Sequence, residues 1–584
     1  MTASDSSTPL KVLFLSSDTG GGHRASAESL GGQFQELFPG SQYNLHDIHT
    51  EDGLPPWNRL VDNYKHLSAH PQQWKMFYKI TNTEAVNVIF DTAQKMTCEK
   101  AMRNSIMEHD PDVVVSVHPM MNNIPALSCQ KISQETGRYL PIFTVVTDLA
   151  TAHSMWFCNG VDRIYIASDE CRKIAKDRGN FPDHKITQIG LPIRTQFGQQ
   201  AELLGDRMSP EGVQYQQSVR QNLGLPVVDK KTVLVMGGGE GVGSLSNIVN
   251  ALYMEFYDRG IDALILVVCG RNEKLKKDLE IRDWDAMMAD ARAKQSQSKA
   301  FGLRSLSFQS CISGTPDMTT SSQQDGCMEG SVTQKIKRIL SSSSIGKIAS
   351  QNALADLNEI NGVATTTKTS RSSSPVSLPP VGEQEDEDAI EVDDEFHIKI
   401  GKDDVNYIDS NDAEDDSTSS PQVRDVDLPE SSTQKGNVTV VGLGFVTKMA
   451  EYMVAADVLI SKAGPGTIAE AASLSLPIML TSFLPGQEEG NVDYVVSGGF
   501  GAFIEDKNPD GVAREVGNWL TNEEKAKEMS IKAKSWGAPH AARDIAENIG
   551  KIALKWKYIN DERERLNAEA EKLKLGTLNL DGDE

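Results

Sequence analysis

The 584-residue sequence lacks several features that would mark particular classes of protein. Its seven cysteines lie far apart and none forms a CxxC pair, which argues against a structural zinc site and fits a reducing compartment. No apolar run approaches the roughly 20 residues that a membrane span needs, and the most apolar stretch, Ile261 to Cys269, has strand length. No hydrophobic targeting segment precedes the first expected strand at Lys11. These absences argue against a zinc module and against a membrane-spanning protein.

Apolar and aromatic residues are also scarce, at 39% and 6%, so part of the chain is expected to be unstructured. The net charge is −24, but residues 381–430 hold 19 Asp and Glu against three Lys and Arg. That local net of −16 leaves only −8 for the rest of the chain. Because nucleic-acid binding needs a basic face, the composition argues against a nucleic-acid partner.

The first part of the chain reads as one α/β domain. Short apolar runs, each bounded by Gly, Pro, Asp or His, alternate with helical patterns and lie at Val12–Ser16, Val113–Val117, Ile142–Val146, Ile164–Ala167 and Ile186–Ile189. This alternation is typical of buried parallel strands in a doubly wound fold. We therefore predict a flexible N-terminus at 1–10 and a Rossmann-like domain at 11–195.

A second series of strands begins near Thr232 and predicts a second Rossmann-like domain, built from 196–285 and 437–560. Two such domains face a cleft, with ligands at the carboxyl ends of their strands. Between the two parts, residues 286–436 contain serine runs and an acidic block, and are predicted to be a mostly disordered insertion. Residues 561–584 read as a charged tail.

The first glycine motif follows the first expected strand as DTGGGH and ends at Gly22 and His23. Glycines let the backbone approach a phosphate or sugar, and the helix N-terminus adds partial positive charge. His23 is then a candidate general base in the cleft. The alternative is a plain glycine turn closed by a capping histidine.

A second glycine loop follows the strand TVLVM as GGGEGVG. It lacks the Lys-Ser/Thr of a phosphate-binding Walker loop and fits the dinucleotide fingerprint only loosely. Backbone N–H groups that hold a diphosphate fit both facts, and the candidate residues are Gly238, Gly239, Glu240 and Gly241. The alternative is a tight strand-to-helix turn without a ligand.

Two further motifs follow strands of the second series. The segment SKAGPGTIAE opens a helix, and its turn would present N–H groups and a hydroxyl to a diphosphate, with Glu470 accepting hydrogen bonds from both ribose hydroxyls. The segment PGQEEGN offers amides and carboxylates suited to sugar hydroxyls. The donor-site candidates are Lys462, Ala463, Gly464, Pro465, Gly466, Thr467, Glu470, Gln487, Glu488 and Asn491. A first-turn acid that stabilises the helix dipole is the alternative for Glu470, and a solvated turn for the last motif.

Together these motifs resemble the monogalactosyldiacylglycerol synthase family, inverting glycosyltransferases related to the bacterial transferase that adds N-acetylglucosamine to a lipid-linked peptidoglycan precursor. The matching segments include VLFLSSDTGGGHRASAESL, VVVSVHPMMNNIPAL, TVVTDLATAHSMWF, VLVMGGGEGVGSL, ADVLISKAGPGTIAEA and LPGQEEGNVDYVV. The resemblance covers nearly all of residues 11–550 outside the insertion.

The resemblance implies a GT-B fold and transfer of galactose from UDP-galactose to 1,2-diacylglycerol with inversion, a 1,2-diacylglycerol 3-beta-galactosyltransferase activity. The product would be monogalactosyldiacylglycerol for photosynthetic membranes. No metal cofactor is implied, because loop amides and a helix dipole stabilise the leaving UDP. It also implies a peripheral membrane location at the plastid envelope, and an anionic phospholipid as an activator. A homodimer is left open.

The resemblance extends to individual residues of this chain. His23 becomes the base for the diacylglycerol hydroxyl or an activating contact to it. Asp148 lines the wall of the cleft and is the second candidate catalytic residue. Contacts to uracil fall to Phe445 and Val446. Contacts to the acceptor or the lipid surface fall to Pro56, Trp57 and His153.

Alternatives stay open from the sequence alone. The chain would also fit a diacylglycerol glucosyltransferase, a UDP-sugar 2-epimerase of the same architecture, or a non-catalytic sensor of UDP-sugar. A protein without a span must bind a membrane by an amphipathic surface, and the segment Trp57–Tyr78 is the candidate. Packing of those aromatics in the core is the equally weighted alternative.

Overall fold

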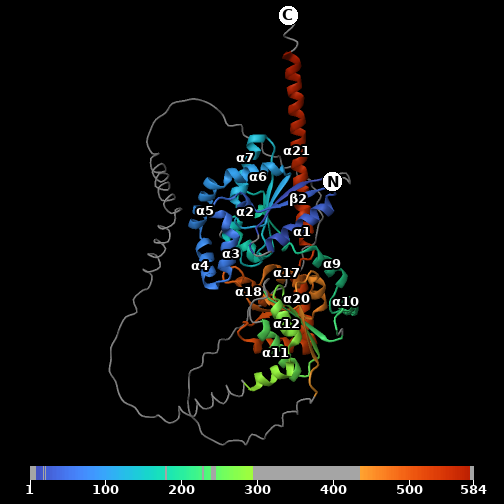
Figure 1. Ribbon diagram of the computed structural model, residues 1–584. Helices are drawn as coiled ribbons and strands as arrows, with labels where there is room; N and C mark the ends of the chain where they lie inside the picture. Colours follow the sequence, from blue (N-terminus) through green and yellow to red (C-terminus); the bar gives the residue numbers. More distant parts are fainter. Residues whose placement is uncertain are drawn as a thin grey trace, which may run out of the picture. The chain divides into compact units, whose positions relative to one another are not determined.

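Two sheets of six strands, each strand parallel to its neighbours, organise the part of the chain that the structure describes (Figure 1). The computed structural model describes residues 8–17, 19, 22–177, 180–226, 229–237, 245–293 and 434–578. The first sheet has the order β2-β1-β3-β4-β5-β6 and the second the order β12-β11-β10-β7-β8-β9. The predicted pair of doubly wound α/β units of the GT-B class is confirmed.

The strands of the first sheet are β1 (Lys11–Leu15), β2 (Gln42–His46), β3 (Val113–Ser116), β4 (Ile142–Val145), β5 (Arg163–Ile166) and β6 (Ile186–Gln188). Those of the second are β7 (Lys231–Met236), β8 (Ala263–Val268), β9 (Val438–Leu443), β10 (Val458–Lys462), β11 (Ile478–Ser482) and β12 (Gly501–Phe503). The central strands are mainly apolar because helices cover both faces of a parallel sheet. The edge strand β2 alternates exposed and half-buried residues, so it lacks the apolar run that marks the others.

Helices of the first unit include α1 (Gly22–Leu37), α2 (Ile48–Asp52), α3 (Leu60–Ser68), α4 (Pro71–Thr81), α5 (Glu84–Thr97), α6 (Glu99–His109), α7 (Asn123–Thr136) and α8 (Asp169–Asp177). The second unit includes α9 (Thr195–Leu204), α10 (Pro210–Asn222), α11 (Leu245–Asp258), α12 (Glu273–Ile281), α16 (Met449–Ala455), α17 (Pro465–Ser473), α18 (Glu489–Ser497), α19 (Pro509–Thr521) and α20 (Glu523–Trp536). The last helix, α21, runs from Ala541 to Leu578. No helix in the described ranges is both long and apolar enough to cross a bilayer.

Strand order fixes where a ligand site can form. In the first sheet the order reverses between β1 and β3, and in the second between β7 and β10. Segments that leave neighbouring strands at such a switch point diverge to opposite faces and open a crevice at the carboxyl ends. The predicted motifs around His23 and Gly464 follow β1 and β10, so the fold delivers both motifs to switch points.

The predicted insertion at 286–436 lies mostly outside the described residues. At its start, residues 284–293 are helical, and at its end residues 434–437 lead into β9. The side chain of Met288 in that helix is buried. The packed part of the second unit therefore continues past Ala286.

The C-terminal helix α21 packs on the first unit, far from its place in the sequence. Its Ile545 and Ile549 join a core cluster with Phe34 and Phe38, in which α1 lies against α21. A Cβ on Gly550 would lie 2.2 Å from the ring of Phe38, so a residue with a side chain does not fit there without displacement. The chain thus returns to cover the sheet that it formed first.

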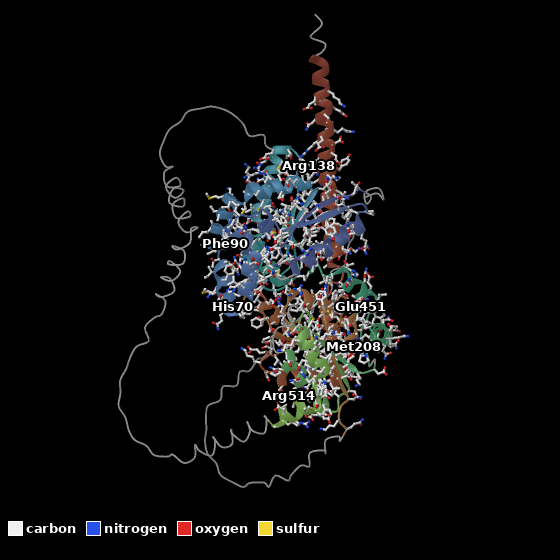
Figure 2. The ribbon with its side chains drawn as sticks, in the orientation of Figure 1. His70, Phe90, Arg138, Met208, Glu451 and Arg514 are labelled. Carbon is white, nitrogen blue, oxygen red and sulfur yellow. The ribbon has the colours of Figure 1, made fainter. Side chains whose placement is uncertain are left out.

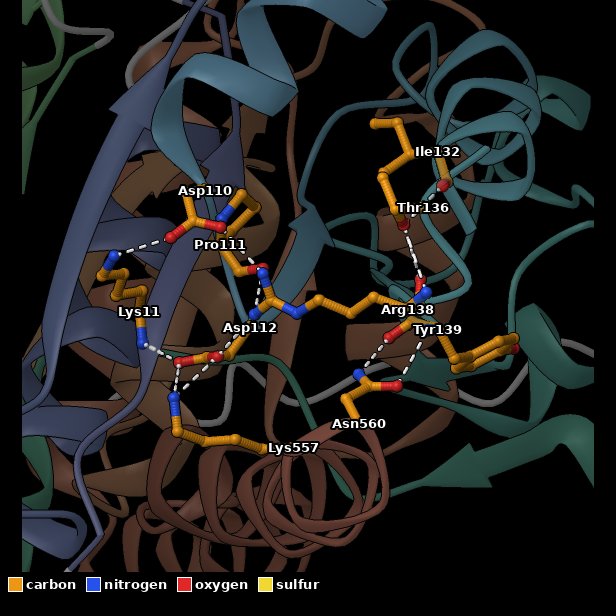
Figure 3. Close-up of polar contacts among 10 residues, drawn as sticks. All are labelled: Lys11, Asp110, Pro111, Asp112, Ile132, Thr136, Arg138, Tyr139, Lys557 and Asn560. Carbon is orange, nitrogen blue, oxygen red and sulfur yellow. Dashed lines mark hydrogen bonds and ion pairs between the residues drawn. The ribbon is translucent and has the colours of Figure 1, made fainter. Parts of the chain in front are cut away.

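A buried carboxylate secures this contact (Figure 3). The Asp112 side chain, 2% exposed, accepts hydrogen bonds from Lys557 of α21 at 2.8 and 2.9 Å and from Arg138 at 2.9 Å. It also accepts the backbone N–H of Lys11 at 2.9 Å. Asn560 adds two hydrogen bonds to the backbone of Tyr139, at 2.9 and 2.8 Å. Asp112 therefore joins β1, the segment before β4 and α21.

Replacing this carboxylate should loosen the helix. We expect Asp112→Ala to lower the free energy of unfolding by about 2–4 kcal/mol, since it leaves clustered cations and a backbone donor without their acceptor. The control is Asp110→Ala, whose 60% exposed carboxylate pairs with Lys11 and Arg138 and should change stability by less than about 1 kcal/mol. Denaturant unfolding measures both, and equal effects would contradict the buried role of Asp112.

Candidate active site

His23 is held in a buried pocket at the first switch point. It is the second residue of α1, and its Nδ1 lies 2.7 Å from Oγ1 of Thr147, which follows β4. The rings of His118 and Trp156 lie against it, with centroids at 4.9 and 6.0 Å. Burial lowers the pKa of His23 to about 4, and contact with the Val117 carbonyl opposes that shift. The imidazole is therefore neutral at neutral pH, the state in which it can accept a proton.

Further buried histidines surround this position. The pKa of His118 lies well below its usual range, first through burial and then through its neighbours His23, His49 and His153. Burial also lowers the pKa of His49 to about 4, against the raising effect of Asp47. The first unit thus concentrates neutral imidazoles near the carboxyl ends of β1 and β3.

Asp148 follows Thr147 directly and is also buried. Its Oδ2 accepts a hydrogen bond from Trp156 Nε1 at 2.6 Å. Burial raises the pKa of Asp148 to about 6, with Glu488 adding to the shift while Trp156 and Gln487 oppose it. Residues of the second unit therefore act on a carboxyl group of the first, and the two sites predicted from separate motifs converge here.

The residues expected to meet the acceptor or the lipid fall into two environments. His153 is buried; its Nε2 lies 3.2 Å from Thr81 Oγ1, and its ring lies 5.2 Å from that of Tyr78. Pro56 is exposed. Trp57 is only 5% exposed and donates from Nε1 to Thr97 Oγ1 at 3.0 Å. The structure places Trp57 in the core, because its indole finds both an apolar pocket and a hydrogen-bond acceptor there.

The segment Trp57–Tyr78 accordingly divides by burial. Trp74 and Tyr78 face inward with Trp57, whereas Met76 and Phe77 are 60% and 40% exposed. His70, which precedes α4, and Phe90 on α5 mark this helical layer in Figure 2. Core packing therefore holds for Trp57, Trp74 and Tyr78, and contact of the exposed Met76 and Phe77 with a membrane stays a prediction.

In the second unit, the turn after β10 leads into α17. Gly464 is the N-cap of this helix, with Pro465 at its first position and Gly466 and Thr467 in its first turn. Lys462 extends its ammonium to Glu488 at 2.6 Å. Free N–H groups at a helix start together with a lysine favour an anion, and this is where the sequence predicted the diphosphate.

Glu470, the predicted ribose ligand, is paired within the protein. Its two carboxylate oxygens accept hydrogen bonds from Nε and Nη2 of Arg194, at 2.7 and 2.8 Å. Burial raises the pKa of Glu470, and Arg194 opposes that shift. A carboxylate that is both buried and held by a bidentate guanidinium has a fixed orientation. Any ribose contact would have to share it with Arg194.

The first turn of α18 bridges the two units. Asn491 is 1% exposed; its Oδ1 accepts the N–H of Ala150 at 3.1 Å and its Nδ2 donates to the carbonyl of Ala463 at 2.9 Å. Gly490 donates its N–H to Thr151 Oγ1 at 2.9 Å. The amide of Asn491 thus joins the Asp148 segment to the turn between β10 and α17, and its predicted contact with the sugar stays a prediction.

The remaining candidates differ in what the structure says of them. Gly238, Gly239, Glu240 and Gly241 lie outside the described residues. Phe445 is 75% exposed, and Val446 packs on the core of the second unit. The Gln487 Oε1 atom is buried without a hydrogen-bond partner among the described residues. Ala463 lies between β10 and α17, and Gly22 is the first residue of α1.

Three polar contacts of this region were not anticipated from the sequence: those of Thr147, His118 and Arg194. A signal existed for each, since every one of them stands a few residues after an apolar strand, in TVVTDL, VVVSVHP and IGLPIR. Within the described ranges, no group of three or more His, Cys, Asp or Glu is arranged to hold a metal ion.

The buried histidines predict an acid-sensitive fold. Below about pH 6.5, His23 and His49 bind protons in the unfolded chain, but in the folded chain they stay neutral down to about pH 4. The free energy of unfolding therefore decreases as the pH falls from about 6.5 to about 4. At pH 5 each of these two histidines lowers the free energy of unfolding by about 2 kcal/mol. The raised pKa of Asp148 has the opposite effect and adds about 1 kcal/mol. The melting temperature should therefore drop by several degrees between pH 7 and pH 5.

The variant His49→Phe removes one titrating group from a fully buried position, so its melting temperature should depend less on pH than that of the wild type. Replacing the exposed His184 by Phe is the control and should leave the dependence unchanged. A wild-type melting temperature that is constant or rises toward pH 5 would rule out neutral buried imidazoles.

Comparison with known proteins finds relatives of both units. Residues 23–193 match the family model described as Monogalactosyldiacylglycerol (MGDG) synthase, and residues 419–549 match the Glycosyltransferase family 28 C-terminal domain. The chain is 27% identical over 548 residues to Monogalactosyldiacylglycerol synthase 2, chloroplastic, of Arabidopsis thaliana, covering 93% of this chain and 81% of that protein. The Spinacia oleracea monogalactosyldiacylglycerol synthase, chloroplastic, is also 27% identical, with 93% and 72% covered.

Among solved structures, Acinetobacter baumannii MurG aligns with a TM-score of 0.44 and 12% identity, covering 93% of this chain and all of that one. A putative UDP-N-acetylglucosamine 2-epimerase from Listeria monocytogenes aligns at 0.39 and 8%, with 92% and 95% covered. The family models and the relatives, which span both units, identify this chain as a glycosyltransferase that is similar to the monogalactosyldiacylglycerol synthases.

Proposed function

We propose that the chain transfers galactose from UDP-galactose to 1,2-diacylglycerol with inversion at the anomeric carbon. The observation that carries the proposal is the position of His23, a neutral imidazole at the first switch point. The donor turn at the start of α17 is linked to the same region through Asn491. Transfer with inversion needs a base for the acceptor and a site that stabilises the leaving group. In this proposal the first unit provides the base and the second unit stabilises the leaving group.

His23 acts as the base in this scheme. It takes the proton of the diacylglycerol hydroxyl while the hydroxyl oxygen bonds to the anomeric carbon. Its pKa of about 4 makes it a weak base. A bound diphosphate brings negative charge nearby, which favours the protonated ring and raises its basicity when the donor is present. Asp148, one residue after the His23 partner Thr147, is assigned to a substrate hydroxyl.

The leaving UDP is stabilised by α17 and its preceding turn. The N–H groups around Gly466 and Thr467 and the partial positive charge of the helix face the diphosphate, and the ammonium of Lys462 adds a full charge. Glu470 binds the ribose while Arg194 keeps its carboxylate oriented. We assign Gly238, Gly239, Glu240 and Gly241 to the diphosphate, and Phe445 and Val446 to uracil. Gln487 and Glu488 are assigned to the sugar. The scheme uses no metal cofactor.

A membrane surface presents the acceptor. Helices α4 and α5 expose an apolar face made of Met76, Phe77, Ile80, Val88 and Ile89, with exposed fractions from 38% to 60%. Residues 57–97 carry five Lys and Arg against three Asp and Glu, although the whole chain has a net charge of −24. An apolar face in a locally basic region suits an anionic lipid surface.

The acceptor side of the site adjoins this face. Tyr78 is on the same helix as Met76 and Ile80, and its ring packs against His153. The ring is also close to Gly486, since a Cβ added to that glycine would lie 2.9 Å from it. We therefore propose peripheral attachment through the apolar face, at the plastid envelope as the chloroplastic relatives suggest. Activation by an anionic phospholipid and homodimer formation stay predictions.

A transfer assay on diacylglycerol vesicles tests the chemistry. The wild type should form galactolipid from UDP-galactose at least tenfold faster than glucolipid from UDP-glucose, and His23→Ala should reduce transfer by about 10²–10⁴-fold while UDP binding is kept. His184→Ala is the matched control and should stay at the wild-type rate. Preference for UDP-glucose would reassign the donor, and binding of UDP without transfer would favour a sensor or epimerase.

Vesicle sedimentation tests the surface. The double variant Met76→Asp/Ile89→Asp should lose at least about tenfold in affinity for vesicles that contain anionic lipid, because two charges would enter the interface. Its affinity for UDP should not change. Leu203→Asp on α9 is the control, with 62% exposure but outside the apolar face. Unchanged sedimentation of the double variant would remove α4 and α5 from the membrane contact.

A further inference from the structure

A threonine controls the orientation of the proposed base. The Oγ1 of Thr147 lies 2.7 Å from Nδ1 of His23, and both side chains are at least nine-tenths buried. Thr147 follows β4, whose backbone is hydrogen-bonded between β3 and β5. A rigid sheet therefore fixes this hydroxyl.

The surroundings of the ring restrict how else it can bond. A hydrogen bond with the backbone of Val117 raises the pKa of the His23 imidazole, against the larger lowering by burial. On another side His118 packs edge to face at 4.9 Å between centroids. Nδ1 of His118 accepts the N–H of Met120 at 3.3 Å, so its Nε2 carries the hydrogen and donates to Thr19 Oγ1 at 2.9 Å. His118 is thereby committed to its own contacts.

We propose that Thr147 is the positioning residue of His23, accepting the Nδ1–H and so leaving the lone pair on Nε2 for the acceptor hydroxyl. A histidine's tautomer is set by the hydrogen bond that its other nitrogen makes. The inference rests on the proposed function. In the step it supports, Nε2 takes the acceptor proton and the acceptor oxygen bonds to the anomeric carbon. The bond from that carbon to the diphosphate oxygen breaks, and its electron pair leaves with UDP.

The kinetic test compares variants that keep the shape of the side chain and change its hydroxyl. Thr147→Val should lower kcat by about tenfold or more, because both tautomers then compete and the ring is less fixed. The KM for UDP-galactose should stay within about twofold. Thr147→Ser restores the hydroxyl and should return kcat to within about threefold of the wild type.

A matched control separates this role from folding. Thr144 lies on β4, three residues before Thr147, and is fully buried; its hydroxyl donates to Asn122 Oδ1 at 2.7 Å. Thr144→Val loses a comparable hydrogen bond, so it should lower the melting temperature. At assay temperatures below that melting temperature, its kcat should equal that of the wild type. A Thr147→Val enzyme with wild-type kcat, or a Thr147→Ser enzyme as slow as Thr147→Val, would overturn the proposal.

A second readout does not depend on transfer. Nitrogen NMR of chains with ¹⁵N-labelled histidine should show His23 as the Nδ1–H tautomer at pH 7, and this preference should be lost in Thr147→Val. His23→Gln identifies the signal. An Nε2–H tautomer in the wild type would overturn the role of Thr147 even if galactolipid forms. A wild type with the expected tautomer but no transfer would instead refute the proposed function.

Discussion

The parallel arrangement of both sheets is the constraint on which the rest of the structure depends. Because neighbouring strands run the same way, the segments that leave β1, β3 and β4 reach the same edge and bring His23, His118 and Thr147 together. In the second sheet the same constraint places the turn after β10 beside the crevice. Residues more than a hundred positions apart thus meet without any special local sequence.

Burial then decides the chemistry that these residues can offer. The same exclusion of water that keeps the imidazole of His23 neutral raises the pKa of Asp148. Polar groups in such a place must be hydrogen-bonded. Asn491 and Glu470 meet that demand through protein partners, Ala150 and Arg194. Some of the polar side chains that were predicted to contact the substrate therefore also stabilise the structure of the site.

The sequence predicted most of this fold, because central parallel strands are mainly apolar and end in glycine or polar turns. It missed β2 and β12, which lie at sheet edges and lack a continuous buried run. Motifs located the site but not its hydrogen-bond partners. Nothing local distinguishes Thr147 from Thr144, since only the three-dimensional position of His23 does so. Likewise, the burial of Trp57 depends on Thr97 and Phe90 from another helix.

The central claim is a single displacement assisted by one base, and the configuration of the product tests it most directly. The donor has an α-linked galactose, so one inversion must give a β-linked galactolipid. Proton NMR of the purified glycolipid distinguishes the two by the coupling of the anomeric proton. The account predicts the large coupling of a β-galactoside. The small coupling of an α-galactoside would contradict it, since retention requires a mechanism other than the single displacement served by His23.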